Sequence, residues 1–401
     1  MRAASIIVLI SGLLAVPNVV GQSKIQSPPG VPAAPVAFPA LRDRFVGDEV
    51  CGSCHREKTD TFHQTAHYLT SRLPDKSSIL GKFAPDANTL KTSNPQLSFR
   101  MDEKEDGFFQ TAVEGIAPFY TTERTERFGL VIGSGGKGQT YLFWKGDRLF
   151  QLPISYWTEL GWVNSPGYRD GVANFDRIIV PRCLECHATY FEVIPPSPNR
   201  YGKAGSVVGI TCEKCHGAGR EHVRREGSKL LQSSGSAIDS AILNPARLSR
   251  DRQMDLCAWC HAGLGVALAP TFSYVPGEPL DKYIELPRPA ANVGLDVHGS
   301  QVELLEKSRC YQSSAMTCQT CHDVHTVQHD PSTYSQRCLS CHKPGTVTFP
   351  KMGHEVASNC IDCHMPKQET NLIVFDWNGK KARPQVRNHW IRIYPPPTPP
   401  R

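Results

Sequence analysis

The pentapeptide Cys-x-x-Cys-His occurs seven times in this chain of 401 residues and constrains its fold more than any other feature. A random chain of the same composition would hold about 0.02 copies, so the repeat is not a product of chance. The spacing is that of covalent haem attachment. Two thiols on one short turn bond to the two vinyl groups of a haem, and the imidazole that follows binds the iron. The seven copies begin at Cys51, Cys183, Cys212, Cys257, Cys318, Cys338 and Cys360.

The motifs predict seven covalently bound haem c groups, with fourteen thioether cysteines and seven proximal iron ligands. The attachment cysteines are Cys51, Cys54, Cys183, Cys186, Cys212, Cys215, Cys257, Cys260, Cys318, Cys321, Cys338, Cys341, Cys360 and Cys363. The proximal ligands are His55, His187, His216, His261, His322, His342 and His364. A disulfide framework would not place a histidine after every second cysteine. Zinc sites built from paired Cys-x-x-Cys units do not explain an odd number of units.

Eight histidines lie outside the motifs, and a six-coordinate haem iron needs a second axial ligand. His67 follows the first motif beyond a predicted helical stretch, and His63 shares its face four residues earlier. One of the two is expected to bind iron, and we favour His67. His63 and His329 are the weakest candidates. Setting them aside leaves six distal ligands for seven irons.

Two other histidines are placed so that each would serve a haem other than its nearest one, and a third lies in the closing segment of the chain. His325 follows His322 by three residues and cannot reach round to the same iron. His222 lies six residues after His216 and is likewise expected to bind the iron of another haem. His389 lies close to the C-terminus, where it would bring the tail back over a haem.

The N-terminus has the pattern of a Sec-type signal peptide over residues 1–21. Arg2 precedes an apolar stretch from Ala3 to Val16, and small residues follow at 19–21. The stretch is too short to span a bilayer. We therefore expect a periplasmic or extracellular protein with no stable membrane span after cleavage.

The spacing of the proximal histidines divides the chain. The first gap, from His55 to His187, is 132 residues long (187 − 55), and residues 97–101, 108 onward, 140–144 and 148–152 within it alternate like antiparallel strands. The Gly133–Gly138 loop lacks phosphate-loop spacing and is expected to be a hairpin connection. The expected segments are a Pro/Ala-rich linker (22–45), a haem 1 segment (46–95), a β-rich insert (96–180), haems 2–4 (181–270), haems 5–7 (271–380) and a C-terminal tail (381–401).

These residues resemble multihaem c-type cytochromes of the cytochrome c-552/c-554 family, related to hydroxylamine-oxidoreductase-like and nitrite-reductase-like multihaem cytochromes. The matching stretches are Val46–His55 with His67, Gly209–His222, Cys310–His325 and Cys360–Lys367. The resemblance implies short α-helices and long loops wrapped around stacked haems, with the small antiparallel β-rich insert between haem 1 and haem 2. It also implies mainly bis-His haems with His67, His222, His298, His325, His354 and His389 as distal ligands.

The chain departs from the enzymes of this group in its motifs. All seven end in His, so the Cys-x-x-Cys-Lys site of the pentahaem nitrite reductases is absent. The unpaired Cys310 is read mainly as a small buried residue, with a haem thiolate and a catalytic thiol as alternatives.

The sequence therefore predicts an exported heptahaem cytochrome that transfers electrons between redox partner proteins. The alternative is a reductase or oxidase with one open haem that acts on a small nitrogen or sulfur compound, because the six favoured distal histidines are one short of the seven irons. A filament-forming cytochrome is a third reading, supported only by the Pro-rich ends. The formal charge of +6 is largely offset by haem propionates and does not indicate nucleic acid as a partner.

The number of covalently bound haems per chain can be measured directly. Mass spectrometry of the denatured protein, with its haem absorbance per mole of chain, should report about seven covalent haems, because thioether bonds survive denaturation. A count of two or fewer would contradict the motif assignment.

Overall fold

The computed structural model describes residues 39–116, 118–230, 241–286, 294–343, 358–377 and 379–395. The predicted signal peptide, most of the linker and His354 lie outside these residues. None of the described helices is long and apolar enough to cross a membrane.

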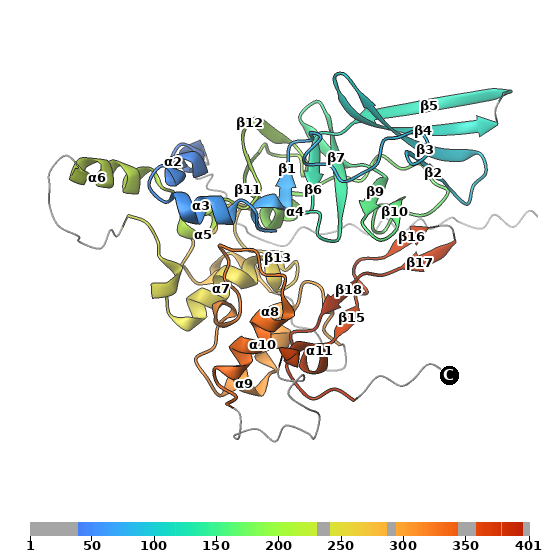
Figure 1. The fold of residues 1–401 in the computed structure, drawn as a ribbon. Helices are drawn as coiled ribbons and strands as arrows, with labels where there is room; N and C mark the ends of the chain where they lie inside the picture. The colour runs from blue at the N-terminus through green and yellow to red at the C-terminus, as the bar shows by residue number, and fades with distance from the viewer. Residues whose placement is uncertain are drawn as a thin grey trace, which may run out of the picture. The chain divides into compact units, whose positions relative to one another are not determined.

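Two antiparallel sheets occupy the first third of the described chain (Figure 1). The first has the order β2-β3-β4-β5, with β2 (Thr89–Lys91), β3 (Leu97–Lys104), β4 (Gly107–Ile116) and β5 (Tyr120–Arg127). The second has the order β1-β6-β7-β9-β10, and β8 pairs with β7 off this path. Its strands are β1 (Ser71–Arg72), β6 (Leu130–Ile132), β7 (Gly138–Lys145), β8 (Arg148–Gln151), β9 (Ile154–Trp157) and β10 (Gly161–Asn164).

The strands follow the expected alternation, with one difference in length. Leu97, Phe99 and Met101 of β3 are buried and alternate with less buried residues. The ladder with β4 runs to the pair Lys104–Gly107, so β3 extends three residues beyond the predicted end at Met101. The turn is therefore two residues long, and Gly107 at its exit has a φ of 145°, which L side chains rarely adopt.

The two sheets share an apolar core made without any haem motif. Phe99, Met101, Tyr141 and Phe143 are at most 1 % exposed in this core. Phe128 stacks on Tyr141 with ring centres 4.4 Å apart. The β-rich segment thus has its own hydrophobic stabilisation.

The rest of the described chain consists of short helices and four two-stranded sheets. The helices are α1 (Pro39–Arg42), α2 (Asp48–Gly52), α3 (Arg56–Phe62), α4 (Pro181–His187), α5 (Cys212–His216), α6 (Arg220–Leu230), α7 (Arg250–His261), α8 (Gln301–Glu306), α9 (Arg309–Gln312), α10 (Pro331–Leu339) and α11 (Cys360–His364). The sheets pair β11 (Ala188–Val193) with β12 (Tyr201–Val208), β13 (Val266–Ala267) with β14 (Ile284–Glu285), β15 (Lys367–Glu369) with β18 (Gln385–Arg387), and β16 (Phe375–Trp377) with β17 (Lys380–Ala382).

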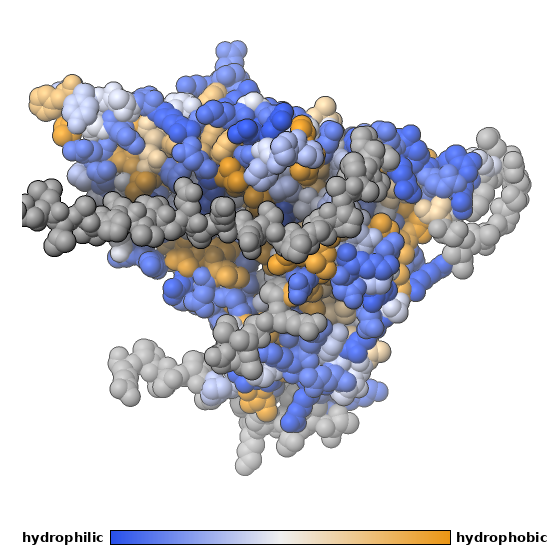
Figure 2. Space-filling model, turned by 180° about the vertical axis from the view of Figure 1, so that it is seen from behind, coloured by the Kyte–Doolittle hydropathy of each residue, from blue (hydrophilic) through white to orange (hydrophobic). Residues whose placement is uncertain are grey.

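Large apolar side chains are exposed in several places outside the sheets' core. Seen from behind, hydrophobic residues gather in a band near mid-height, with mostly hydrophilic residues above and below (Figure 2). Leu264, Val266 and Leu268 are each more than half exposed. Exposed apolar side chains of this kind are available to contact a cofactor or a partner.

Truncating a core side chain tests whether this core stabilises the β-rich segment. Phe99→Ala removes a fully buried ring and should lower the free energy of unfolding by about 3–5 kcal/mol in chemical denaturation followed by circular dichroism. The control Phe119→Ala alters a ring that is 82 % exposed and should change stability by less than about 0.5 kcal/mol. Equal effects of the two variants would contradict the assigned core.

Candidate functional site

Each Cys-x-x-Cys-His motif lies on a short helical segment. The third and seventh motifs coincide with α5 and α11, and the second falls within α4. The first, fourth and sixth motifs lie at the C-terminal ends of α2, α7 and α10. The fifth occupies a 3₁₀ turn at Cys318–Thr320. The His55 N–H donates to the Cys51 carbonyl at 2.8 Å, and His322 repeats this bond to Cys318 at 3.0 Å. One helical turn therefore places both thiols and the imidazole of a motif on one side, as haem attachment requires.

Four of the predicted proximal histidines face a second histidine. An imidazole nitrogen lies about 1.1 Å from its own ring centre and binds a metal at about 2.0 Å, so two imidazoles on opposite sides of one metal would have ring centres about 6.2 Å apart. The four observed pairs match that spacing. The pairs are His55–His222 (6.3 Å), His216–His325 (6.1 Å), His261–His67 (6.1 Å) and His322–His389 (6.3 Å).

Burial keeps several of these imidazoles neutral, which is the form that binds a metal. Desolvation by the surrounding protein, together with facing histidines, lowers the pKa of His261 and of His389 to about 4, although His261 retains exposed surface. Burial and the neighbouring His298 lower the pKa of His187 to about 4 as well. His298 also contributes to the lowered pKa of His261, so this predicted distal histidine lies near two of the motif histidines.

Four predicted ligands have their Nδ1 atoms hydrogen-bonded to the protein, which leaves Nε2 available to a metal. The partners are Leu243 O for His216 (2.8 Å), Arg392 O for His364 (3.0 Å), Arg387 O for His389 (3.1 Å) and Thr70 Oγ1 for His187 (3.0 Å). Bonds of this kind fix the orientation of a ligating ring and raise its basicity.

The remaining histidines are placed differently. In the described ranges, no second imidazole ring lies in contact with His342 or His364. His63 stacks on Tyr68 with ring centres 3.9 Å apart and lies 3.2 Å from an Asp48 oxygen. His329 is exposed.

Thiols of different motifs contact one another. Cys51 and Cys212 share a hydrogen bond that, together with burial, raises the pKa of Cys212. Their sulfur atoms and an Asp48 oxygen lie within 4.8 Å of one another. This triad resembles a metal site, but both of its sulfurs belong to haem motifs. The same contact joins Cys186 to Cys260 and Cys257 to Cys318.

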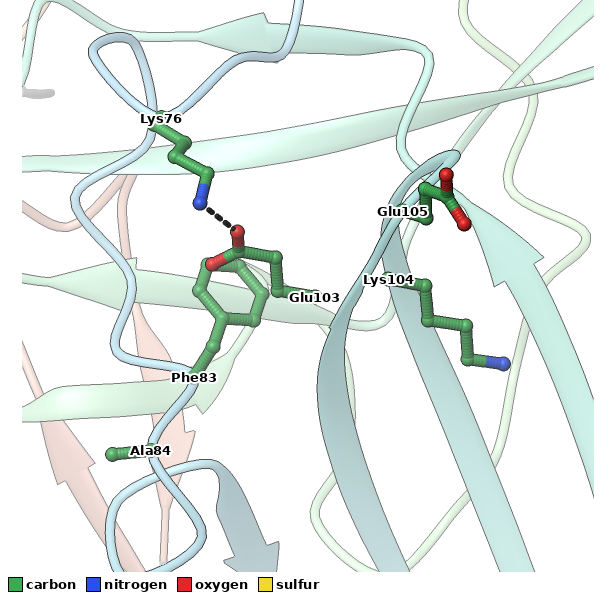
Figure 3. Close-up of a pocket in the computed structure, with 6 residues that line it drawn as sticks. All are labelled: Lys76, Phe83, Ala84, Glu103, Lys104 and Glu105. Carbon is green, nitrogen blue, oxygen red and sulfur yellow. Dashed lines mark ion pairs between the residues drawn. The ribbon is translucent and has the colours of Figure 1, made fainter.

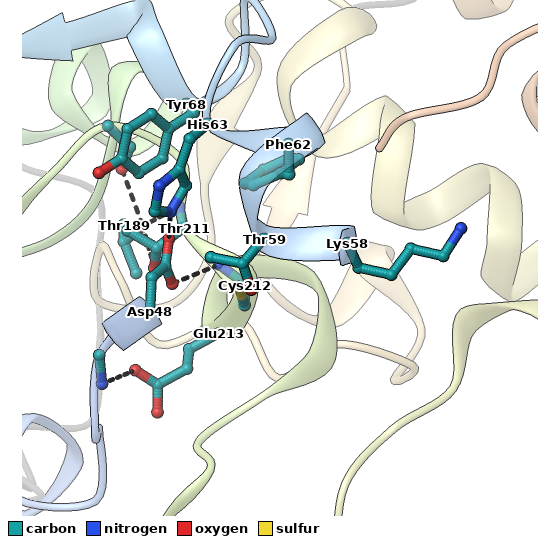
Figure 4. Close-up of polar contacts among 12 residues, drawn as sticks. Asp48, Lys58, Thr59, Phe62, His63, Tyr68, Thr189, Thr211, Cys212 and Glu213 are labelled. Atoms are coloured by element: carbon teal, nitrogen blue, oxygen red, sulfur yellow. Dashed lines mark hydrogen bonds and ion pairs between the residues drawn. The ribbon is translucent and has the colours of Figure 1, made fainter. Parts of the chain in front are cut away.

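Two buried carboxylates lock the first motif onto the third (Figure 4). Glu213 accepts hydrogen bonds from the backbone N–H groups of Val46 (2.9 Å), Gly47 (3.0 Å) and Gly219 (2.8 Å). Asp48 accepts one from the Cys212 N–H at 3.1 Å. Because buried carboxylates need such partners, these bonds fix the two motifs relative to each other.

A buried cation lies where the second, third and fourth motifs meet, a feature that the sequence analysis missed. Lys214 is 6 % exposed, with its Nζ 3.8 Å from the Trp259 ring centre and 3.4 Å from the Thr189 carbonyl oxygen. Burial lowers the pKa of Lys214, while neighbouring thiols and Glu185 raise it. Glu185, Lys214 and Trp259 occupy variable positions of their motifs. A charged residue at such a position looks like a surface residue in the sequence, so the motif spacing alone did not indicate that Lys214 is buried.

Haem fits these residues. The paired imidazoles have the spacing of two ligands on one iron, and exposed apolar side chains such as Val50 (39 %), Val180 (36 %) and Leu264 (68 %) lie within three residues of motifs. A haem face would cover side chains of this kind.

Cys310 on α9 is half-buried rather than fully buried. Burial raises the pKa of Cys321 and of Cys338, and nearby Cys310 adds to both shifts. A hollow elsewhere is lined by Lys76, Phe83 and Glu103, with Lys76 Nζ 2.6 Å from a Glu103 oxygen (Figure 3). It adjoins β3 and contains no motif residue, so it belongs to the sheet and not to the haem sites.

Comparisons with known proteins agree on the class. The family model "Cytochrome c554 and c-prime" matches residues 169–217, which hold the second and third motifs. The dissimilatory sulfite reductase MccA of Wolinella succinogenes is 22% identical over 402 residues, covering 81% of this chain and 51% of that protein. The chain thus spans about half the length of this curated relative. The crystal structure of the outer cell wall cytochrome OcwA matches with a TM-score of 0.51 and 17% identity, covering 87% of this chain and 80% of that one, and shows a shared fold.

Removing the buried cation tests its electrostatic role. A nearby positive charge disfavours the oxidised, more positive haem, so Lys214→Met should lower the reduction potential of at least one haem by several tens of millivolts in a spectroelectrochemical titration. Lys214→Arg keeps the charge and should shift it less. Lys203→Met removes an exposed lysine that packs over Trp144 and serves as the matched control. Identical titration curves for the wild type and Lys214→Met would contradict this role.

Proposed function

Because the chain is a multihaem c-type cytochrome with haem c as its cofactor, we propose that it is an exported heptahaem electron carrier. The observation that carries this proposal is the set of four imidazole pairs with ring centres 6.1–6.3 Å apart. An iron held between two imidazoles has no open position for a substrate. Such a haem accepts and releases single electrons.

In this proposal the distal ligands come from outside the motif that they serve. His222 would serve the first motif, His298 the second, His325 the third, His67 the fourth and His389 the fifth. The ring pairs support four of these assignments, and the effect of His298 on the pKa of His187 supports the other. His354, which lies between the last two motifs in the sequence, is the proposed ligand for one of the remaining two irons.

Contacts between motifs support a continuous electron path. Hydrogen-bonded thiols join the first motif to the third, the second to the fourth, and the fourth to the fifth. Electrostatic interactions of Cys215 with Cys257, Cys321 with Cys341, and Cys338 with Cys360 link the third to the fourth, the fifth to the sixth, and the sixth to the seventh. Haems attached to such neighbouring thiols would lie near one another, which supports a path through all seven.

A second candidate is a reductase in which one open haem binds a small sulfur oxyanion. It is favoured by the similarity of 81% of the chain to a dissimilatory sulfite reductase. His342 and His364, which have no facing imidazole in the described ranges, are the places to look for such an iron.

Electron paramagnetic resonance of the oxidised protein separates the two candidates. An electron carrier with bis-His haems should give a low-spin spectrum. His389→Ala should convert about one haem in seven to a high-spin signal, because it removes one imidazole of a pair. The matched control is His329→Ala, which alters an exposed histidine and should leave the spectrum unchanged.

Two outcomes would argue against the electron carrier. A high-spin signal in the wild type that changes when sulfite is added would favour the reductase. A spectrum of His389→Ala identical to that of the wild type would remove the proposed ligand of the fifth motif.

A further inference from the structure

The outer edge of the four-stranded sheet is long. Its charges are arranged so that positive side chains would face negative ones if two copies of this edge paired antiparallel. We propose that β5 pairs antiparallel with β5 of a second copy of this chain, so that two sheets join edge to edge across a twofold axis at Thr125. β5 is the last strand of its sheet and is almost entirely exposed (Figure 1). This proposal does not depend on the proposed function.

The backbone of β5 presents free hydrogen-bonding groups at that edge. The Phe128 N–H donates to the Phe108 carbonyl of β4 at 2.8 Å, so even-numbered residues of this strand point their N–H and C=O groups at β4. Because these groups alternate along a strand, those of Glu123, Thr125 and Arg127 point away from the sheet. The described part of the chain pairs no other strand with this side of β5. An exposed row of this kind is a template for adding a strand.

The side chains select one register for the added strand. Charges along Glu123-Arg-Thr-Glu-Arg127 are inverted about Thr125, with Arg124 and Glu126 on either side of it. With Thr125 opposite its own copy, Arg124 faces Glu126 and Glu123 faces Arg127. A twofold axis perpendicular to the sheet keeps these partners on the same face.

Registers shifted along the strand lose this match. Centring the pair on Arg124 places two arginines opposite each other, and centring it on Glu123 or Glu126 places two carboxylates opposite each other. Like charges directly opposite in a sheet are destabilising. The Thr125 register forms four interchain ion pairs and about six backbone hydrogen bonds.

The neighbouring contacts are compatible with pairing. The Thr125 hydroxyl lies 2.9 Å from that of Thr111 within the sheet, and Arg124 lies over the Phe175 ring at 4.4 Å. Neither contact uses the outward backbone groups. The charged side chains already form ion pairs within the chain, Arg124 with Glu126 and Glu123 with Arg100, so a second copy would share or exchange these exposed pairs. The joined edge is smaller than the roughly 1,600 Å² of a standard interface, so the dimer should form in a concentration-dependent way. Charges on an edge strand also serve to prevent pairing, which makes a monomer the alternative outcome.

Sedimentation equilibrium of the haem-loaded protein over a range of concentrations tests this pairing. The wild type should move from one to two chains as concentration rises, and added salt should weaken the dimer because its ion pairs are exposed. Thr125→Pro removes an outward N–H and leaves the ladder to β4 intact, because proline is tolerated at sheet edges. It should raise the dimer dissociation constant by about one order of magnitude or more. Thr125→Val loses the hydroxyl, keeps the N–H and should dimerise like the wild type.

A charge exchange provides a second test that does not rely on proline. Glu123→Arg places like charges across the axis and should weaken the dimer. Adding Arg127→Glu to that variant recreates opposite pairs with reversed polarity and should restore it. A wild type that is monomeric at every concentration, Thr125→Pro that dimerises like the wild type, or a double variant no tighter than Glu123→Arg would each overturn the proposal.

Discussion

The separation of two imidazole rings on one iron is the constraint on which the haem-bearing part of the molecule depends. Rings with centres about 6 Å apart must come from backbone segments held at a matching distance. In the observed pairs these segments are remote in sequence: His67 faces His261, and His55 faces His222. If each pair binds an iron, each iron closes a long loop and acts as a cross-link. This explains how a chain with short helices and few strands in that region holds a defined shape.

The β-rich segment is organised by a different principle. Its strands bury aromatic side chains such as Phe99 and Tyr141 against one another, and no motif residue contributes to that core. Hydrophobic burial suffices there, whereas the motif-bearing region relies on bonds to cofactors and on buried polar contacts such as those of Glu213. The two parts should therefore respond differently to haem loss: the sheets retain their main stabilising interactions and the helices do not.

The sequence allowed local features, such as motifs and strands, to be predicted, but few of the contacts between residues that are distant along the chain. The motif spacing predicts the attachment residues. Alternation placed β3, although it missed the last three residues because polar side chains continue the ladder to Lys104. Spacing also predicted that His325 would serve a haem other than the one bound by His322. Which haem could not be read from the sequence, because the pairing with His216 depends on loops whose paths no local pattern encodes. Lys214 was missed for a related reason, since its burial results from three motifs meeting in space.

The contacts between thiols of different motifs have a consequence for the order of events in biogenesis. Cys51 touches Cys212, and Cys257 touches Cys318, in the folded arrangement. A chain that folded before receiving its haems would hold these sulfurs within reach of each other, and an oxidising compartment would favour disulfides between them. Each such bond would remove one attachment point from two haems at once. If the motifs carry haem in an oxidising compartment, maturation would require the thiols to stay reduced, and the haems to be attached, before the motifs come together.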